Sequence, residues 1–336
     1  MDLRPSQEQQ QLVDAFASLY AAEAPTSKVR DAEPLGFSAE LWTRLRETGA
    51  LEMAVPEDRG GWGATLLDLA LVAEQHGRAV APAPLIEAQV AARLLARVGA
   101  DVLPEVLSGE RLVTVAVRPA RAGALALVPA GAVADHALAL DGDRLVLVDV
   151  PRDVRHVNNS GCLPLADLDV PPDATVLAEG GEAVEAYARA LDEWRVLTAA
   201  ALAGIAARAL EIGVAYVKER QAFGVAIGSF QGVAHRLADR ASEVDGAELL
   251  AREAAWSAAE EPERAAELAA MAFGFAAETA RDTTYHALHF HGGYGFMLEY
   301  DAQLYFRRAR AWANVLCEPR AAYRRVADVR YATAGS

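Results

Sequence analysis

Residues 220–239 read Arg-Gln-Ala-Phe-Gly-Val-Ala-Ile-Gly-Ser-Phe-Gln, continued by Gly-Val-Ala-His-Arg-Leu-Ala-Asp. Ala-rich stretches with helical periodicity lie on both sides of this Gly-containing break, which predicts a helix–loop–helix corner. Arg220 ends the first predicted helix, Gln231 begins the second, and Phe223 lies between them. A guanidinium suits a phosphate, an amide recognises a polar edge and an aromatic ring supports a flat ligand. On spacing alone, the favoured interpretation is an ordinary corner with a solvated Arg and a core Phe.

The helical period around this corner extends from Glu182 to Arg330. Ala is abundant there, and Val, Leu and Ile recur at helical spacing. A Glu-Glu-Pro-Glu run at 260–263 and the Gly292-Gly293 turn divide the pattern into separate helices. Residues 179–336 are therefore predicted to form an antiparallel four-helix bundle, whose small Ala faces let helices, or two subunits, pack closely.

Short β-rich runs precede the bundle. They lie at residues 112–117, 124–128, 136–140 and 144–150, separated by turns such as Asp-Gly-Asp at 141–143. Pro171-Pro172 is expected to mark the exit from this small β domain, which we place at residues 111–178.

Residues 1–110 again have helical periodicity and are predicted to form an N-terminal helical domain. Ser6 and Ser38 each precede apolar residues at helical spacing, which is typical of an N-cap. The predicted fold class is therefore mainly α with a small β domain: N-terminal helices, a reduced middle β-barrel-like domain and a C-terminal four-helix bundle.

Composition limits the classes of function. The 336 residues are 53% hydrophobic and 24% charged, which is typical of a soluble globular chain with a large core. A net charge of -15 argues against nucleic acid or an anionic membrane as partner, because both require a positive face. The two cysteines, Cys162 and Cys317, form no metal-ligand spacing or disulfide framework, so we expect no metal and a reducing cytoplasm. No basic, apolar signal segment begins the chain, and no uninterrupted apolar run approaches ~18 residues, so no membrane span is expected.

Three separated stretches carry motifs in a fixed order. The first comprises Leu-Trp at 41–42, Gly-Ala-Leu-Glu-Met-Ala-Val-Pro-Glu-Asp-Arg-Gly-Gly-Trp-Gly at 49–63, Glu-Gln-His-Gly-Arg at 74–78 and Ala-Pro at 81–82. The second is the corner itself, with its Arg-x-x-Phe-Gly, Phe-Gln and His-x-Leu-Ala-Asp elements. The third is His-Phe-His-Gly-Gly-Tyr-Gly-Phe-Met-Leu-Glu-Tyr at 289–300, followed by Leu-Tyr-Phe-Arg-Arg-Ala-Arg at 304–310. Together they cover most of the chain, which resembles the acyl-CoA dehydrogenase family of flavoproteins.

This resemblance implies an activity and a cofactor. The family removes a proton alpha to the carbonyl of an acyl-CoA thioester and passes the beta hydrogen as hydride to FAD. An electron-acceptor flavoprotein then reoxidises the FAD. The positions that match the family's FAD contacts are Arg220, Phe223, Gln231, His289, Gly292 and Gly293. In a homo-oligomer, the first three reach the FAD of the neighbouring subunit, and the Gly-Gly turn lets main-chain N–H groups approach the dinucleotide. The family commonly has Gln at the position of His289, so one FAD contact is expected to be altered.

Asp192 and Arg195 match a family helix that contacts the coenzyme A arm, and so are candidate substrate-binding residues. An acid–base pair at i, i+3 on a helix is equally expected as a plain surface salt bridge.

The catalytic base is where the chain departs from the family. The family's Glu occupies one of two positions, which fall here at Leu316 and Trp194, and neither side chain can accept a proton. The nearest carboxylates are Glu193 and Glu318, one and two positions away. One step along a helix rotates a side chain by roughly 100°, so Glu193 is not a simple replacement. We expect both to be surface carboxylates, and the base is unknown.

The β domain also departs from the family, because the stretch after Val115-Ala-Val-Arg-Pro119 is shorter than usual. The part of the site that holds the flavin ring and the thioester is therefore expected to be reduced or absent. These two departures indicate the short subunit of a heteromeric actinobacterial acyl-CoA dehydrogenase, paired with a related full-length subunit. The alternatives are a self-sufficient homodimeric or homotetrameric dehydrogenase of acyl-CoA or acyl-carrier-protein thioesters, and a flavin monooxygenase or oxidase on the same scaffold.

Overall fold

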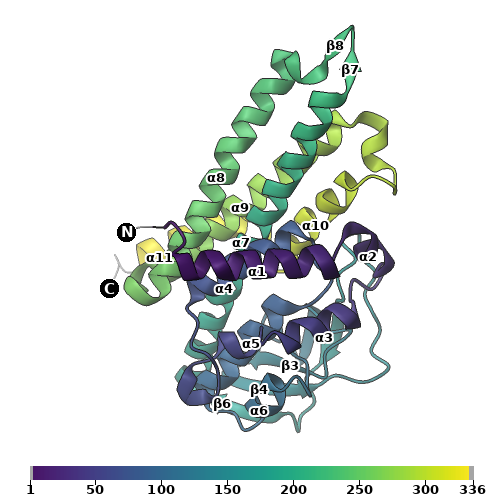
Figure 1. The fold of residues 1–336 in the computed structure, drawn as a ribbon. Coiled ribbons are helices and arrows are strands. Elements are labelled where there is room, and N and C mark those ends of the chain that lie inside the picture. Colours follow the sequence, from purple (N-terminus) through teal and green to yellow (C-terminus); the bar gives the residue numbers. More distant parts are fainter. Residues whose placement is uncertain (1–2, 333–336) are drawn as a thin grey trace. The chain divides into compact units, whose positions relative to one another are not determined.

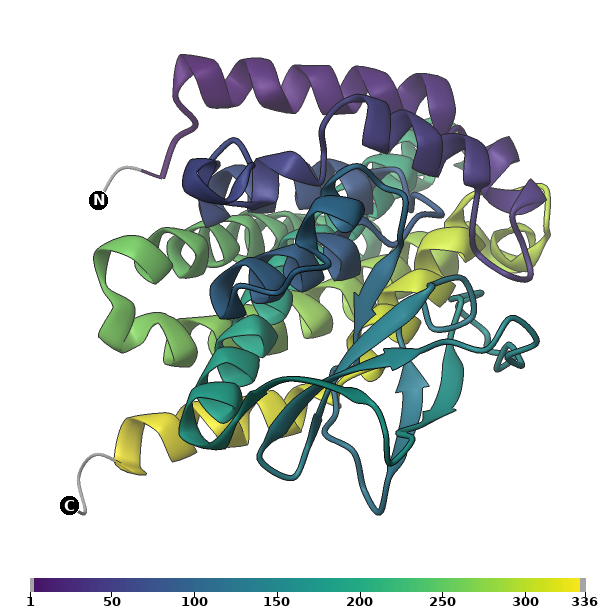
Figure 2. The same cartoon turned by 90° about the horizontal axis from the view of Figure 1, so that it is seen from below.

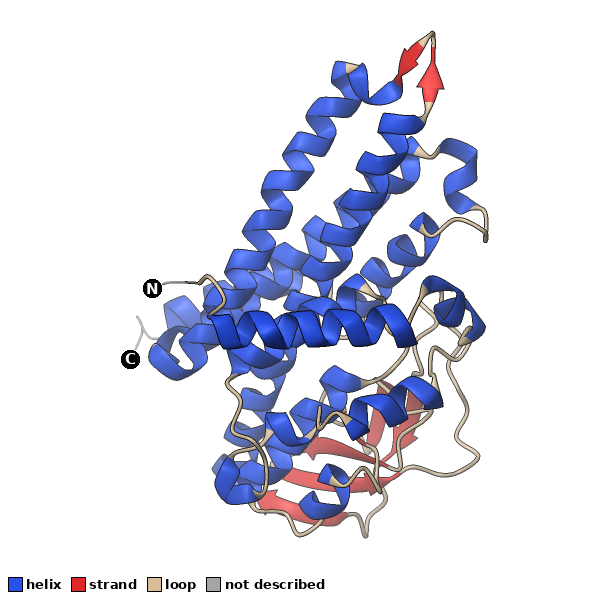
Figure 3. Ribbon diagram, viewed as in Figure 1, coloured by secondary structure: helices blue, strands red, loops and turns tan. Residues whose placement is uncertain are grey.

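The computed structural model describes residues 3–332, and most of its elements are helices (Figures 1 and 3). The N-terminal elements are α1 (Gln7–Glu23), α2 (Thr26–Asp31), α3 (Ala39–Glu47), η1 (Glu52–Ala54), η2 (Glu57–Arg59), α4 (Leu66–Arg78), α5 (Leu85–Val98) and α6 (Leu103–Leu107). Both predicted caps are present. The Ser6 hydroxyl accepts from the Gln9 amide while the Gln9 side chain accepts from the Ser6 amide, and the Ser38 hydroxyl accepts from the Leu41 amide.

Six strands follow, and they gather in the teal part of the chain (Figure 2). They are β1 (Val113–Val115), β2 (Ala124–Val128), β3 (His136–Asp141), β4 (Arg144–Asp149), β5 (Ala166–Asp169) and β6 (Thr175–Glu179). The four predicted runs are confirmed. The predicted exit at Pro171-Pro172 is wrong, because β6 follows these prolines and pairs with β4.

The strands form two small sheets. One has the order β1-β3-β4-β6, with β1 parallel to β3 and the other pairs antiparallel, and the second pairs β2 with β5. A shared apolar core contains Leu125, Val128, Ala137, Ala139, Val146, Val148, Ala166 and Leu168. Residues two apart on β3 and β4 thus point to the same face, as the period of a strand requires. Within residues 3–332 these sheets form no closed barrel, so the middle β region is smaller than a barrel.

The C-terminal part is helical except for one hairpin. Its elements are α7 (Gly180–Glu219), β7 (Gln221–Ala222), β8 (Val225–Ala226), η3 (Ile227–Ser229), α8 (Gln231–Glu260), α9 (Pro262–Phe290), η4 (Gly292–Phe296), α10 (Ala302–Asn314) and α11 (Pro319–Ala332). Helix α9 packs against α8, α10 and α11. α7 is long and apolar enough to cross a membrane, but 78% of its most apolar window is buried inside the protein. This burial is that of a core helix in a soluble protein.

The chain forms two compact units, each assembled from segments that are distant in sequence. Unit 1 comprises Met1–Thr26, Ala70–Ala81 and Arg195–Ser336, and unit 2 comprises Ser27–Leu69 and Pro82–Trp194. The division into three consecutive domains, with boundaries near 110 and 178, stays a prediction.

Close helix packing in unit 1 depends on two glycines. A Cβ at Gly77 of α4 would lie 1.8 Å from the carbonyl oxygen of Ala201, and one at Gly204 of α7 would lie 2.0 Å from that of Glu74. Any larger residue would separate the two backbones. Arg78 also pairs with Glu211, and Arg252 of α8 lies 3.0 Å from Glu74, so α4 is bound to both long helices.

Candidate functional site

The predicted corner is a hairpin at the end of α7 (Figure 1). Gln221 pairs with Ala226 and Ala222 with Val225, which leaves Phe223 and Gly224 as a two-residue loop. Both have positive φ, at 53° and 82°, as in a type I′ turn. A glycine adopts this conformation readily, whereas a Phe is strained by it.

Phe223 is 96% exposed, so the prediction of a core Phe is wrong. Its ring meets Phe230 edge to face at 6.3 Å, and Phe230 is itself 38% exposed. A strained, exposed aromatic ring at a loop tip contributes nothing to the core of this unit. Such a residue is typical of a binding surface.

Arg220 follows the last residue of α7 and is exposed. Its amide donates to the Tyr216 carbonyl, and its own carbonyl accepts from the Ile227 amide, so the backbone is fixed on both sides. Its guanidinium bonds to no other described residue. Gln231, the first residue of α8, is likewise exposed and makes no side-chain bond within residues 3–332. The solvated Arg of the simpler interpretation is thus confirmed as far as this chain alone is concerned.

The other predicted FAD contacts, at the end of α9, lie beside the hairpin. His289 is exposed on the last turn of α9, and Gly292 and Gly293 begin η4. The buried His291 between them stacks on Tyr216, with ring centroids 3.9 Å apart and planes 23° apart. Because Tyr216 also holds the Arg220 amide, this stack brings the ends of α7 and α9 together.

The Gly-Gly turn leaves its backbone open. Gly292 has φ 61°, and a Cβ at Gly292 or Gly293 would meet no atom of the described residues within 4 Å. Packing within the chain therefore does not explain the pair. The exposed main-chain N–H groups are available to a ligand instead.

These residues fit the adenosine diphosphate arm of FAD, the cofactor that the family resemblance implies. A guanidinium, an amide and exposed backbone donors suit a pyrophosphate. Strands β1–β6 form two small open sheets and no closed barrel among the described residues, and a reduced wall for the flavin ring stays a prediction. The donor set in unit 1 thus matches half of a dinucleotide site.

The candidate substrate residues lie on α7. Asp192 is half-buried and Arg195 is only 8% exposed. A pair with a buried guanidinium is not a plain surface salt bridge, so that alternative is wrong for Arg195. A contact with coenzyme A stays a prediction.

Glu193 is also not the surface carboxylate that the sequence predicts. It is 4% exposed, and its Oε1 accepts from Arg97 at 2.8 Å and from Arg93 at 3.1 Å. Oε2 is buried and has no hydrogen-bond partner among the described residues. Burial alone would raise the pKa of Glu193, but the two guanidinium groups outweigh it and hold that pKa below its ordinary value. A carboxylate held in this way is a poor proton acceptor.

Neither of the two positions at which the family has its catalytic base holds a carboxylate in this chain. Trp194 is 2% exposed, and its indole N–H donates to Oε1 of Glu87 at 3.3 Å. Leu316, the other position, is half-buried and has no ionisable group. Glu318 is exposed on the surface, as predicted.

Four contributors were missed at the level of sequence. Tyr216 gives no signal beyond its place one turn before Arg220. Glu87 lies in the first turn of α5, where an acidic residue is expected for helix stability alone. Burial raises the pKa of Glu87, while bonds from its own backbone amide and from Trp194 lower it in part. Arg93 and Arg97, which bind Glu193, show only i, i+4 spacing in sequence.

Comparison with known proteins identifies the family. The family model "Acyl-CoA dehydrogenase, N-terminal domain" matches residues 6–110, and "Acyl-CoA dehydrogenase, C-terminal domain" matches residues 184–313. The acyl-CoA dehydrogenase IpdE2 of Mycolicibacterium smegmatis is 33% identical over 96% of this chain and 98% of its own length. IpdE2 of Mycobacterium tuberculosis is 30% identical over the same shares.

Two solved structures have the same fold over nearly the whole chain. One is the ChsE4-ChsE5 complex from Mycobacterium tuberculosis, with TM-score 0.89 and 26% identity over 100% of both chains. The other is a variant of the Tcur3481-Tcur3483 steroid ACAD, with TM-score 0.88 and 28% identity over 98% of this chain and 99% of that one. The chain therefore belongs to the acyl-CoA dehydrogenase family, the FAD-dependent oxidoreductases that act on acyl-CoA thioesters.

Proposed function

We propose that this chain is one subunit of a hetero-oligomeric acyl-CoA dehydrogenase. It supplies the residues around Arg220 and Gly292 to the adenosine end of a FAD, and a related full-length subunit supplies the base and the flavin-ring contacts. The observation that carries this proposal is the state of the base positions. Trp194 is buried, and the neighbouring Glu193 is bound by two arginines.

Each of this chain's residues has a defined task in that arrangement. Arg220 neutralises the pyrophosphate charge, Gln231 donates to a polar edge of the dinucleotide, and Phe223 covers its flat surface. The backbone of Gly292-Gly293 donates to phosphate oxygens. When bound, FAD accepts the hydride from the beta carbon, while the proton from the alpha carbon goes to a carboxylate of the partner subunit.

Similar proteins support this proposal. Both solved structures are named for two components, ChsE4-ChsE5 and Tcur3481-Tcur3483, and the second is named as a steroid ACAD. A bulky, steroid-derived acyl-CoA is therefore the first substrate class to test. We further propose that Asp192 and Arg195 contact the coenzyme A arm, that the electrons pass to an electron-transferring flavoprotein, and that the complex works in the cytoplasm, as the acidic, cysteine-poor chain indicates.

Co-expression tests the division of labour. The chain is produced alone and with a related full-length subunit encoded near it, followed by light-scattering mass and flavin-to-protein ratio. The proposal expects stoichiometric FAD and acyl-CoA oxidation only in the mixed oligomer. A chain that alone binds stoichiometric FAD and oxidises acyl-CoA at the full rate contradicts it.

One observation favours a second candidate function, a self-sufficient dehydrogenase. Trp194 occupies one of the family's positions for the base, and its indole N–H donates to the Glu87 carboxyl. Burial raises the pKa of Glu87. A carboxylate with a raised pKa is a suitable general base. The Glu87→Gln variant separates the two functions, because it abolishes turnover only if this chain carries its own base. Glu318→Gln, on the surface, is the matched control.

A further inference from the structure

An exposed pair of aromatic rings lies on the last two turns of α9, before the Gly-Gly turn. Tyr285 is 47% exposed, and its ring stacks on that of the exposed His289, with centroids 5.7 Å apart and planes 16° apart. Near-parallel rings at consecutive turns of one helix form a flat apolar step. Neither side chain belongs to the buried core of the described residues.

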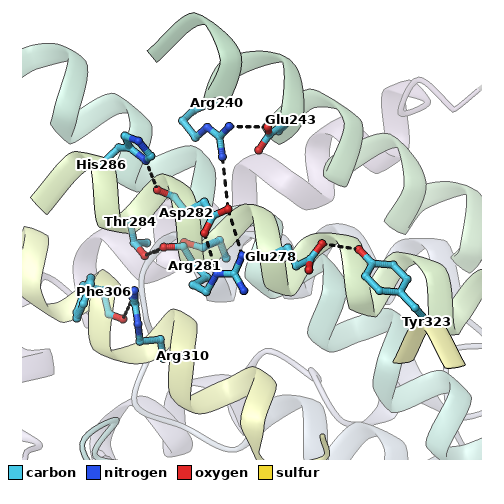
Figure 4. Close-up of polar contacts among 11 residues, drawn as sticks. Arg240, Glu243, Glu278, Arg281, Asp282, Thr284, His286, Phe306, Arg310 and Tyr323 are labelled. Atoms are coloured by element: carbon cyan, nitrogen blue, oxygen red, sulfur yellow. Dashed lines mark hydrogen bonds and ion pairs between the residues drawn. The ribbon is translucent and has the colours of Figure 1, made fainter. Parts of the chain in front are cut away.

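The nitrogens of His289 are not used within the described part of the chain. The neighbouring His286 differs, because its Nδ1 donates to the carbonyl of Asp282 at 2.7 Å (Figure 4). Its ring stands perpendicular to that of Tyr285. The His286 side chain therefore bonds within its own helix, α9. His289 and Tyr285 face outward.

The helix beneath this step is held on two sides. Asp282 receives two bonds from Arg281, at 2.7 and 3.2 Å, and lies 3.7 Å from Arg240 of α8 (Figure 4). Glu278 accepts from the hydroxyl of Tyr323 of α11 at 2.8 Å. The step is thus presented on a helix fixed to its neighbours, which suits recognition of a flat ligand.

The position of the step specifies the ligand. His289 lies three residues before Gly292, and the stack of His291 on Tyr216 places this end of α9 beside Arg220. A ligand whose phosphates lie against Arg220 and Gly292 therefore has its next group within reach of α9. The proposed function assigns the adenosine end of FAD to this chain, so the flat group next to these phosphates is the adenine.

We propose that Tyr285 and His289 form the stacking platform for the adenine of the FAD shared with the partner subunit. This inference rests on the proposed function and deepens it. An imidazole that stacks thus takes the place of the amide that the family commonly has at this position. Base–aromatic stacking of this kind changes affinity by about tenfold to a hundredfold per base.

The test measures ligand affinity in the assembled complex rather than turnover. Apo-complexes carrying Tyr285→Ala, Tyr285→Phe or the control Tyr331→Ala are titrated with FAD and with FMN, followed by flavin fluorescence. Tyr331 is an exposed residue of α11. ADP competition against FAD reports the adenine arm without a flavin. We expect Tyr285→Ala to weaken FAD and ADP at least about tenfold and to leave FMN within about twofold, with Tyr285→Phe and Tyr331→Ala like wild type.

His289 variants distinguish stacking from hydrogen bonding. His289→Phe keeps the ring and is expected to retain FAD, whereas His289→Ala loses affinity. The proposed platform is wrong if His289→Phe loses as much FAD affinity as His289→Ala. It is also wrong if Tyr285→Ala lowers the affinities for FAD and FMN equally or lowers neither.

Arg220→Ala separates failure of the platform from failure of the proposed function. If Arg220→Ala lowers the affinity for FAD and Tyr285→Ala leaves it unchanged, only the platform is overturned. If neither variant changes the affinity for FAD, the shared FAD site is overturned together with the platform.

Discussion

The end of the bundle in unit 1 and the contact between α5 and α7 in unit 2 use similar side chains in opposite ways. Arg220, Gln231 and His289 are exposed and bond to no described side chain. Glu193 and Arg97 are held together out of solvent, with 5% and 23% of their side chains exposed. Polar groups that are satisfied within the chain stabilise the fold, whereas groups left open on a fixed backbone are available to a ligand. The contact between α5 and α7 therefore stabilises the fold, and the exposed end of the bundle is the binding region.

The largest expected effect is on stability, at Glu193. The Glu193→Ala variant leaves Arg93 and Arg97 without their carboxylate in a partly buried site. Breaking such a pair costs about 3 kcal/mol of unfolding free energy. Urea denaturation measures this loss, and the surface variant Glu318→Ala is expected to stay within about 0.5 kcal/mol of wild type. If Glu193→Ala unfolds like wild type but no longer supports turnover, the region is catalytic and the comparison fails.

A smaller effect on stability is expected from a buried histidine in unit 1. His76 is 3% exposed, its Nδ1 lies 3.1 Å from the Tyr20 hydroxyl, and burial lowers its pKa to about 4. The unfolded chain takes up this proton near the ordinary value of 6.5, so the folded state loses stability as pH falls from 6.5 to about 4. The loss attributable to this group is about 2–3 kcal/mol.

The measurement is unfolding free energy between pH 8 and pH 4. His76→Gln is expected to lose less stability over this interval than wild type. Tyr20→Phe keeps the buried imidazole and serves as the control, with an acid loss like that of wild type. An identical pH dependence for wild type and His76→Gln contradicts the assignment.

The sequence predicts most of the fold because local signals agree with the packing. Ser6 and Ser38 begin helices, Pro262 separates α8 from α9, and four of the six main strands lie where alternation predicts them. The sequence misses strand β6 because Pro171-Pro172 indicates an end of the β domain, whereas two prolines in a connection do not prevent a later strand from pairing.

The candidate site was predicted unevenly. Motif spacing located Arg220 and Gly292, but whether a side chain is exposed depends on contacts that spacing does not record. Phe223 and Glu193 show this limit, since the Phe expected in the core is exposed and the Glu expected on the surface is buried. The arginines that bury Glu193 lie on α5, about a hundred residues earlier, and no local pattern links the two helices.

A third prediction concerns binding at the exposed end. Arg220→Ala removes a cation that bonds to no described residue, so unfolding free energy is expected to change by less than about 0.5 kcal/mol. A charge-assisted bond to phosphate is lost, which lowers FAD affinity by about tenfold to a hundredfold. Flavin retention on dilution of the complex measures this effect. The exposed Arg152→Ala is the control, and an equal loss of flavin in both variants contradicts a specific contact.

The smallest expected effect tests the hairpin, where binding and stability are predicted to move in opposite directions. Phe223 adopts φ 53° in a type I′ turn, in which Asn followed by Gly is preferred. Phe223→Asn is therefore expected to raise the unfolding free energy by about 0.5 kcal/mol while weakening FAD, because the strain is relieved and the ring is lost. Thermal unfolding of the chain and FAD titration of the complex measure the two changes. If Phe223→Asn stabilises the chain and leaves FAD affinity unchanged, this ring does not contact the dinucleotide. If the variant destabilises the chain, the 6.3 Å contact with Phe230 contributes more than the strain costs, and the hairpin belongs with the structural region.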